Sequence, residues 1–150
     1  MSKQLNIALV AHDARKKELL EWSEFNKGKL KDHHLYATGT TSKILSEIVV
    51  DDSNLAITPL LSGPLGGDQQ IGAMIAEGKI DILIFFCDNL ITQGHHQDVG
   101  ALTRLASLYN IGFATNRTTA DMLLTSPLFA NEEYERIIPN TIQNYANRKL

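Results

Sequence analysis

The chain has 150 residues, 43% of them apolar, which is enough to bury one core but too little for two domains of ordinary size. We therefore expect a single domain spanning 1–150. The net charge is only −3 and no lysine and arginine block stands out, so composition argues against a general nucleic-acid or membrane-surface partner. The longest apolar run, Ile82–Cys87, is far shorter than the roughly 20 residues that cross a bilayer. The single cysteine, Cys87, has no disulfide partner, which predicts a reduced, cytoplasmic setting.

Short apolar runs recur along the chain and are typical of buried strands. They lie at Ile7–Ala11, Leu35–Ala37, Ala56–Leu61, Ile82–Phe86 and Ile111–Ala114. Pro59 weakens the third assignment, because proline lacks the amide hydrogen that a sheet ladder requires.

Segments with helical spacing separate these runs. Their apolar positions are Leu19, Trp22 and Phe25, then Ile44 and Ile48, then Ile71, Met74 and Ile75, then Leu102, Leu105, Ala106 and Tyr109. Two more helices are expected near Ala120–Thr125, opened by a capping pattern at Thr118–Asp121, and near Thr141–Arg148. Strands that alternate with helices predict an α/β fold, a three-layer doubly wound sheet that is mainly parallel.

Polar clusters follow directly after the apolar runs. They are His12-Asp13, Thr38-Gly39-Thr40-Thr41, Ser62-Gly63, Asp88 and Thr115-Asn116. In open α/β sheets ligands bind outside the carboxyl ends of the strands, so these clusters are expected to share one edge. Part of this set has an ordinary alternative role, since Ser, Thr, Asp and Gly also cap helices and form turns.

The segment Ser62–Gln70 combines glycines, hydroxyl and amide groups and one carboxylate, Asp68. Glycines let backbone N–H groups approach a ligand, and the helix expected to begin near Gln70 would point its positive end at the same place. The spacing is not that of a Walker A loop. The segment therefore suits an anion site beside a general base, although a purely structural turn is the alternative.

Donors for a phosphate group are present in two places. Thr38–Thr41 precedes a predicted helix, and Ser62-Gly63 offers a second set of the same kind on a neighbouring strand. Lys16 could add the positive charge that a dianion requires. The alternatives are an ordinary helix cap for the threonines and a solvated side chain for Lys16.

Candidate acids and bases are Asp68, Asp88 and Asp98 with His12 and His95. Carboxylates gathered in a dry cleft oppose one another's ionisation, and histidine titrates near neutrality, so this set suits proton transfer. We expect no catalytic metal, since the pairs His33-His34 and His95-His96 lack the i, i+4 spacing of zincins. A nucleophilic mechanism is disfavoured too, because Ser62 is not in Gly-x-Ser-x-Gly and Cys87 lies between Phe86 and Asp88.

Over almost its whole length the sequence resembles the methylglyoxal synthase family. The matching segments are Ala8–Asp13, Tyr36–Thr41, Leu61–Gln70, Gly78–Asp81, Ile84–Phe86 with Asp88, and Ala114–Asn116. Gly66–Gln70 is the specific element. Thr38–Thr41 alone would mark only a wider superfamily, which includes a regulatory domain of carbamoyl-phosphate synthetase and a purine-biosynthesis cyclohydrolase domain.

The resemblance implies conversion of dihydroxyacetone phosphate to methylglyoxal and inorganic phosphate through an enediolate. It implies no organic cofactor or metal, a homohexamer, and inorganic phosphate as both product and inhibitor. Asp68 resembles the base, and His95, which also binds substrate, lies with Asp98 near the substrate oxygens. The remaining implied roles are a supporting catalytic shell of His12 (also substrate-binding), Asp13 and Asp88, a phosphate cradle of Lys16, Thr38, Thr40, Thr41, Ser62 and Gly63, and Arg148 reaching a phosphate in a neighbouring subunit.

Two positions depart from the family pattern. Asn89 and Gly94 stand where the family usually has proline, and Gly94 makes its loop freer. Two alternatives to a lyase remain at this point. An effector-binding module would need the donors at Thr38–Thr41 and Ser62-Gly63 but not Asp68 with His95 and Asp98. A nucleotide-handling cyclohydrolase fragment would need partner segments that so short a chain lacks.

Overall fold

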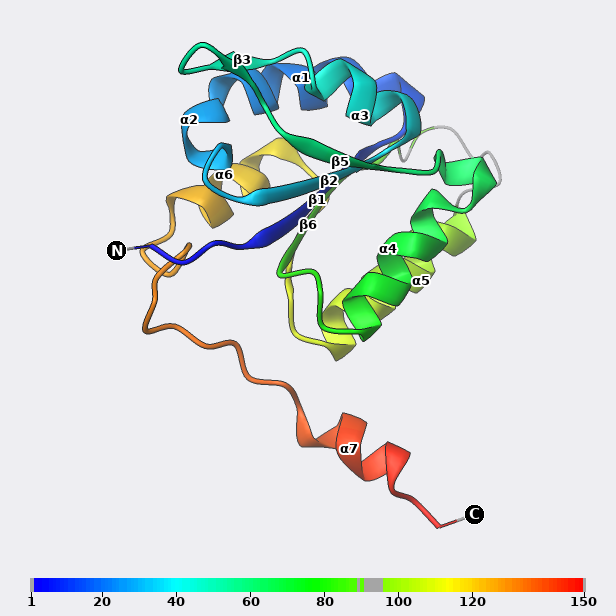
Figure 1. Ribbon diagram of the computed structural model, residues 1–150. Coiled ribbons are helices and arrows are strands. Elements are labelled where there is room, and N and C mark those ends of the chain that lie inside the picture. The colour runs from blue at the N-terminus through cyan, green and yellow to red at the C-terminus, as the bar shows by residue number, and fades with distance from the viewer. Residues whose placement is uncertain (1, 89, 91–95, 150) are drawn as a thin grey trace.

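A parallel sheet forms the centre of the molecule. The structure is a computed structural model, which describes residues 2–88, 90 and 96–149. The strands of the main sheet are β1 (Asn6–Ala11), β2 (His34–Thr38), β5 (Ile57–Leu60), β6 (Ile82–Phe86) and β7 (Gly112–Ala114). They lie in the order β5-β2-β1-β6-β7, and all neighbours run in parallel (Figure 1). The chain winds outward from β1 on one side and from β6 on the other, so the topological switch point lies between these two strands.

Helices cover both faces of this sheet, as Figure 1 shows. One face packs against α1 (Lys16–Phe25), α2 (Lys27–Leu30), α3 (Gly39–Leu45) and α6 (Arg117–Thr125). The other face packs against α4 (Gly67–Ala76) and α5 (His96–Leu108). The three-layer, doubly wound α/β fold expected from the sequence is therefore confirmed.

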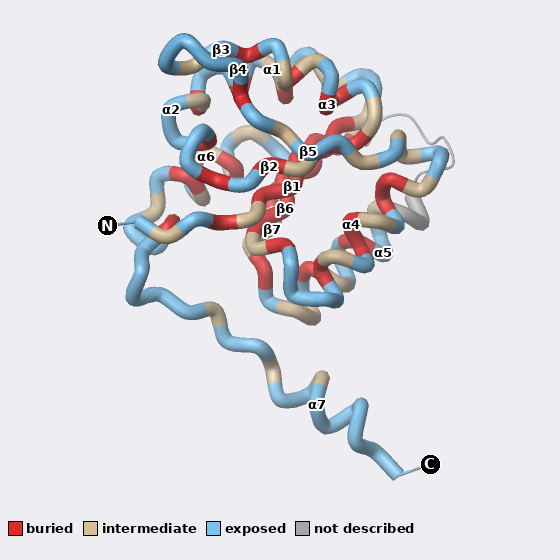
Figure 2. Tube along the Cα trace, in the orientation of Figure 1, coloured by how far each residue is buried: buried red, intermediate tan, exposed pale blue. Residues whose placement is uncertain are grey.

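The core alternates along each central strand, because successive side chains point to opposite faces. In β1, Ile7 and Leu9 join the core under α1, while Ala8 and Val10 join the core under α4 and α5. Figure 2 shows the buried residues concentrated in β1, β6 and the inner sides of the helices. Each large aliphatic side chain removed from water in this way stabilises the fold by about 1.5–3 kcal/mol. Both faces of the central strands are buried, as their uninterrupted apolar runs predicted.

The strand predictions are confirmed, including the one that Pro59 weakened. Pro59 lies in β5, paired with Ala37 of β2, and β5 is an edge strand. An edge strand is bonded on one side only, and proline is tolerated there. The strand pair β3 (Val49–Val50) and β4 (Ser53–Asn54) was not predicted, and its turn residues Asp51 and Asp52 both have positive φ.

The predicted helices are present, with local corrections. Ile48 and Tyr109, expected in helices, lie beyond the ends of α3 and α5. The pattern at Thr118–Asp121 was expected to open α6, but Asn116 is the cap, and its side chain accepts a hydrogen bond from the backbone N–H of Thr119 at 2.9 Å. Asparagine reaches this amide from one position outside the helix, which threonine inside the first turn cannot do. Phe25 was expected on the buried face of α1 but is exposed, because α1 ends there.

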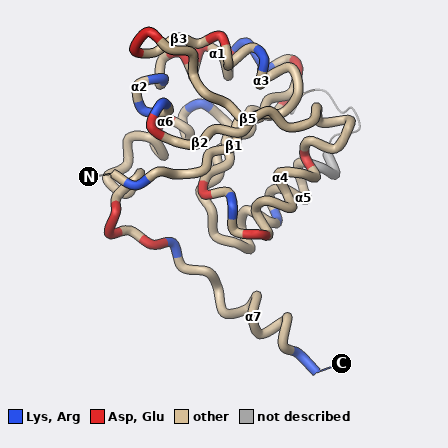
Figure 3. The backbone as a smooth tube through the Cα atoms, viewed as in Figure 1, with Lys and Arg blue, Asp and Glu red and all other residues tan. Residues whose placement is uncertain are grey.

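The C-terminal segment leaves the body of the molecule. Helix α7 (Asn140–Ala146) lies apart from the sheet in Figure 1, and residues 140–149 are almost entirely exposed. Residues 137–147 carry no charged side chain, and Arg148 and Lys149 follow them, as Figure 3 shows. We call residues 134–149 the tail. Elsewhere in Figure 3 cationic and anionic residues are interspersed.

No helix in the part of the chain that the structure describes is long and apolar enough to span a membrane.

His33 is the buried histidine of the amino edge of the sheet. Its Nδ1 accepts the backbone N–H of Leu5 at 3.0 Å, and its ring packs edge-on against Phe129. Burial lowers the pKa of His33, against the opposing effect of the charges of Asp32 and Asp81. The unfolded chain therefore takes up a proton at this position at higher pH than the folded chain does. Stability from this group is complete above about pH 6.5 and is lost as the pH falls through the folded-state pKa.

We predict that the free energy of unfolding falls between about pH 7.5 and about pH 5.5, and that His33→Asn reduces this fall because asparagine keeps an acceptor but does not titrate. Urea unfolding at both pH values measures the difference. His34→Asn, at the exposed neighbour, is the control and should show the same fall as the parent. An equal fall in His33→Asn and the parent would contradict the assignment.

Candidate active site

A cavity of about 580 Å³ opens at the carboxyl ends of β1, β2, β5 and β6. Its position at the switch point is where open α/β sheets bind ligands. It brings together most of the residues singled out from the sequence: His12, Asp13, Lys16, Thr38, Thr40, Thr41, Ser62, Gly63, Asp68 and Asp88. The predicted gathering of polar strand ends is thus confirmed for four strands.

The fifth cluster behaves differently. Thr115-Asn116 follows β7 but is not among the residues that line the cavity, and Asn116 caps α6 instead. In the described part of the chain, its role is the ordinary capping role that the sequence left open.

Close backbone approach assembles the cavity. Gly39, with φ +39°, lies so near the β5 loop that a Cβ atom there would be 2.6 Å from Ser62 Cβ. A Cβ atom on Gly67 would be 1.9 Å from the Leu61 carbonyl oxygen and 2.9 Å from Thr38 Cγ2. No larger residue fits either position without moving backbone. The two loops carry the hydroxyl and backbone N–H groups that suit a phosphate. They can come into contact because Gly39 and Gly67 have no side chains.

Asp68 lies in the first turn of α4 and is only 5% exposed. Its carboxylate faces Gly63, since a Cβ atom on Gly63 would lie 3.6 Å from Asp68 Oδ1. The helix N-terminus favours an anionic side chain at this position. The structure therefore places a buried carboxylate directly beside the small, donor-rich turn after β5.

Threonine hydroxyl groups also line the cavity. Thr38 and Thr41 are buried, and Thr41 Oγ1 has no hydrogen-bond partner among the described residues. A buried hydroxyl without a partner costs free energy, which an anion bound in the cavity would recover. Thr40 is exposed and lies at the rim.

Ser62 and Gly63 begin the short turn that ends at Gly66. The Gln70 side chain supports this loop, because its Oε1 accepts a hydrogen bond from the backbone N–H of Leu61 at 2.8 Å. The sequence suggested amide donors in this segment but not this structural contact. A glutamine one turn into a helix, next to a glycine-rich loop, is the signal that would have suggested it.

His12 and Asp88 connect the ends of β1 and β6. The backbone N–H of Asp88 donates to His12 Nδ1 at 2.8 Å, and the imidazole packs edge-on against Phe85 with ring centroids 5.1 Å apart. Because Nδ1 accepts, the neutral ring carries its proton on Nε2. Phe85 also lines the cavity, although the sequence marked it only as part of an apolar strand.

Charge in the cavity is unbalanced. Among the described residues that line it, Lys16 is the one cation, and it is paired with Asp13; Asp68 and Asp88 add further negative charge. The described lining of the cavity therefore offers an anion little net positive charge.

Three predicted residues are not placed in the cavity. His95 lies outside the described residues, as do Asn89 and Gly94. Asp98 lies in α5, where its side chain is outside the described part, but Val99 and Gly100, which follow it, line the cavity. Arg148 is in the tail, where it donates to the Tyr145 carbonyl oxygen and stacks over the Tyr145 ring.

Cys87 is buried next to the site, and its thiol lies 3.4 Å from the Phe85 carbonyl oxygen. Burial, with a smaller contribution from the charge of Asp68, raises the pKa of Cys87 to about 11. The thiol is therefore protonated at neutral pH and is a poor nucleophile, as its neighbours suggested. Among the residues whose placement is described, no group of three or more His, Cys, Asp or Glu is arranged to hold a metal ion.

Comparison with known proteins defines first the class and then the family. A family model described as an MGS-like domain matches residues 18–115. The chain is 55% identical over 136 residues to a methylglyoxal synthase from Pseudoalteromonas atlantica, with 91% of this chain and 98% of the relative covered. It is 50% identical over 150 residues to one from Photorhabdus laumondii, covering 100% of this chain and 95% of the relative.

The fold agrees with a solved structure. The crystal structure of methylglyoxal synthase from Elizabethkingia anophelis NUHP1 superposes with a TM-score of 0.87 at 43% identity, covering 100% of this chain and 95% of that one. The chain therefore belongs to the methylglyoxal synthase family.

We predict that Gly67→Ala destabilises the protein by about 1–3 kcal/mol and disturbs Asp68, because the added methyl group would meet the Leu61 backbone. Gly28→Ala in α2 is the matched control, since a Cβ atom there meets nothing within 4 Å. Alanine at Gly28 should leave stability equal or slightly higher. Denaturant unfolding of the two variants measures both effects, and equal stability would show that the approach at Gly67 is not constraining.

Proposed function

We propose that this protein converts dihydroxyacetone phosphate to methylglyoxal and inorganic phosphate through an enediolate. The observation that carries the proposal is the buried Asp68 carboxylate beside Gly63, in the same cavity as the hydroxyls of Thr38, Thr41 and Ser62. This arrangement offers a base next to a phosphate cradle. The many relatives named methylglyoxal synthase support the same reaction.

The proton transfer begins at the hydroxyl-bearing carbon of the substrate. In this mechanism Asp68 removes a proton there, and the electron pair moves toward the carbonyl to give the enediolate. His95, with Asp98, polarises the carbonyl oxygen or moves protons, as the family resemblance implies. His12 and Asp88 support this pair from the ends of β1 and β6, where their hydrogen bond fixes the imidazole.

Loss of phosphate completes the reaction. The hydroxyl group of the enediolate gives up its proton and its carbon becomes the aldehyde C=O. The C=C pair shifts toward the phosphate-bearing carbon, the C–O bond to phosphate breaks, and phosphate leaves with that bonding pair. The enolate that remains takes up a proton at its terminal carbon and becomes methylglyoxal. Elimination requires the breaking C–O bond to stand roughly perpendicular to the enediolate plane, and such orientation is worth several kcal/mol, up to roughly 7–11. The cradle of Lys16, Thr38, Thr40, Thr41, Ser62 and Gly63 therefore directs the reaction as well as binding substrate.

A second copy of the chain completes the site in this proposal. The lining of one cavity is poor in positive charge, and the tail carries Arg148 away from its own body at the end of an uncharged segment. We place Arg148 against the phosphate of a neighbouring subunit in a homohexamer. Inorganic phosphate, which has the same charge, then acts as product and as inhibitor.

Two remaining parts of the proposal are supported indirectly. Residues 1–150 form one domain in this proposal, and the single five-stranded main sheet supports it. The protein works in the cytoplasm, which the lone, protonated Cys87 thiol suits. An effector-binding module remains the competing function, but such a module does not account for a buried carboxylate at the cradle.

We predict that Asp68→Asn lowers kcat by at least about two orders of magnitude while phosphate still binds, because the amide cannot accept the proton. The assay mixes protein with dihydroxyacetone phosphate and a chelator and follows methylglyoxal and phosphate together. Asp52→Asn, in the exposed turn between β3 and β4, is the matched control and should keep full activity. Near-normal turnover of Asp68→Asn would refute the role of Asp68. Formation of glyceraldehyde phosphate would indicate an isomerase, and no turnover by the parent would favour the effector module.

We predict that Arg148→Ala weakens phosphate inhibition by at least about tenfold, because a charge-assisted bond to phosphate is lost. Lys149→Ala removes the same charge one residue away and should change inhibition much less.

The neighbouring-subunit role has its own test. Mixed oligomers of Asp68→Asn and Arg148→Ala subunits should regain phosphate inhibition, since their catalysing sites keep Asp68 and can receive Arg148 from an Asp68→Asn neighbour. Phosphate titrations of Arg148→Ala that overlay those of the parent, or mixtures inhibited no more strongly than Arg148→Ala alone, would show that Arg148 does not act across subunits.

A further inference from the structure

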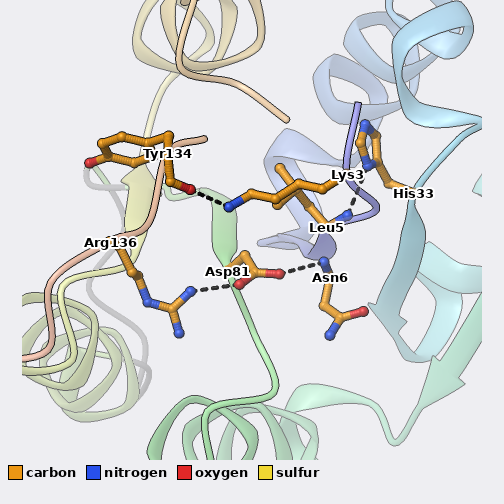
Figure 4. A network of polar contacts seen from close by, with 7 residues as sticks. All are labelled: Lys3, Leu5, Asn6, His33, Asp81, Tyr134 and Arg136. Atoms are coloured by element: carbon orange, nitrogen blue, oxygen red, sulfur yellow. Dashed lines mark hydrogen bonds and ion pairs between the residues drawn. The ribbon is translucent and has the colours of Figure 1, made fainter. Parts of the chain in front are cut away.

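Asp81 is a junction at the amino edge of the sheet, opposite the cavity. Its backbone N–H donates to the Asn6 carbonyl oxygen at 2.9 Å, and its carbonyl oxygen accepts the N–H of Gly112 at 3.0 Å. Its carboxylate Oδ2 also accepts the N–H of Asn6 at 2.8 Å (Figure 4). Asp81 therefore joins the starts of β1, β6 and β7, and its position is fixed by the rigid centre of the sheet.

The other carboxylate oxygen of Asp81 holds the tail. Arg136 Nη1 lies 2.6 Å from Asp81 Oδ1, with side chains 20% and 29% exposed, so solvent screens this pair less than a surface pair. Lys3 Nζ donates to the Tyr134 carbonyl oxygen, which Figure 4 shows beside the Asp81–Arg136 pair. Asn110 Nδ2 donates to the Ile137 carbonyl oxygen at 2.9 Å. All these contacts fall within four residues at the start of the tail.

Apolar packing contributes little at this point. A cavity of about 480 Å³ lies between the start of the tail and the body, lined on the tail side by residues 134–136 and Ile138, and Ile137 is 76% exposed. Beyond Ile137, the hydrogen bonds of the described tail residues stay within the tail. One example joins the backbone N–H of Arg148 to the Tyr145 carbonyl oxygen. The polar contacts at residues 134–137 therefore set the direction in which the tail leaves the molecule.

A small change in the direction of the tail at residues 134–137 becomes a large displacement of Arg148 at its far end. From Arg136 to Arg148 the tail combines the helical turns of α7 with short extended stretches, and spans at most about 30 Å. A change of about 10° in its direction would displace Arg148 by up to about 5 Å, which is more than a hydrogen bond tolerates. The start of the tail therefore needs a stiff anchor if Arg148 is to meet a specific anion.

We propose that Asp81 and Arg136 form a clamp that positions Arg148 for the phosphate group bound in a neighbouring subunit. They are positioning residues, because neither lines the candidate active-site cavity of its own chain. The inference rests on the proposed cross-subunit role of Arg148 and deepens it by naming the groups that aim the tail.

The test compares Arg136→Met with the parent, using methylglyoxal formation and its inhibition by inorganic phosphate. Methionine keeps much of the side-chain volume but removes the charge. We expect the phosphate inhibition constant to rise at least about fivefold, with KM rising more than kcat falls. Arg136→Lys, which keeps the charge, should return the phosphate inhibition constant part of the way to the parent value. Lys27→Met, which breaks the exposed pair with Glu24, is the matched control and should change neither constant.

A double-mutant comparison separates the clamp from general stability. Arg136→Met combined with Arg148→Ala should be no weaker in phosphate inhibition than Arg148→Ala alone, because both changes remove the same contact. Amide hydrogen exchange of residues 137–147 in the oligomer should accelerate in Arg136→Met, while exchange in β1 and β6 stays as in the parent. Asp81→Asn, which keeps an acceptor for Asn6, should reproduce these changes if Arg136→Met fails to fold.

The outcomes are distinguishable. If Arg148→Ala weakens inhibition but Arg136→Met and Asp81→Asn do not, the clamp is overturned and the proposed function stands. Additive losses in the double variant would also overturn it, because they would show that Arg136 acts apart from Arg148. If Arg148→Ala itself has no effect, the cross-subunit role fails and the clamp fails with it, while methylglyoxal formation by the parent still supports the reaction.

Discussion

The candidate site depends on two loops that meet where side chains are absent. Gly39 lies against Ser62, and Gly67 lies against Leu61 and Thr38, so the ends of β2 and β5 approach to backbone contact. This contact puts the two sets of hydroxyl and amide donors on one side of the cavity and brings Asp68, the next residue, into its wall. Because Asp68 lies in the first turn of α4, the direction of that helix and the position of the carboxylate are fixed together.

The centre of the sheet serves both ends of the molecule. At their carboxyl ends β1 and β6 are joined by the hydrogen bond between His12 and Asp88, which orients the imidazole toward the cavity wall. At their amino ends the same strands are joined through Asp81, which also receives the tail. Both strands are buried on both faces, so neither junction can shift without disturbing the core.

The sequence predicts what depends on local pattern. Buried runs such as Ile82–Phe86 mark strands, and polar residues directly after them mark the edge where the cavity lies, so Asp68 and the cradle could be named without coordinates. The roles of Asp13 and Arg148 rest on family resemblance alone. The features that the sequence pattern could not predict depend on contacts between residues far apart in the chain. The Asp81–Arg136 pair joins residues far apart in the chain, and the choice of Asn116 over Thr118 as helix cap depends on where the preceding strand ends. Phe25 fits the apolar spacing of α1 and was therefore expected to be buried, but it is the last residue of the helix and is exposed.

The buried thiol of Cys87 has a consequence for an enzyme that releases a reactive dicarbonyl. Thiolates add readily to such aldehydes, whereas protonated thiols do so slowly. Cys87 adjoins Asp88 in the cavity wall, yet it is 5% exposed and its pKa is raised to about 11. The single cysteine of the chain, beside the candidate site, therefore carries its thiol in the protonated form, which disfavours addition to a dicarbonyl product.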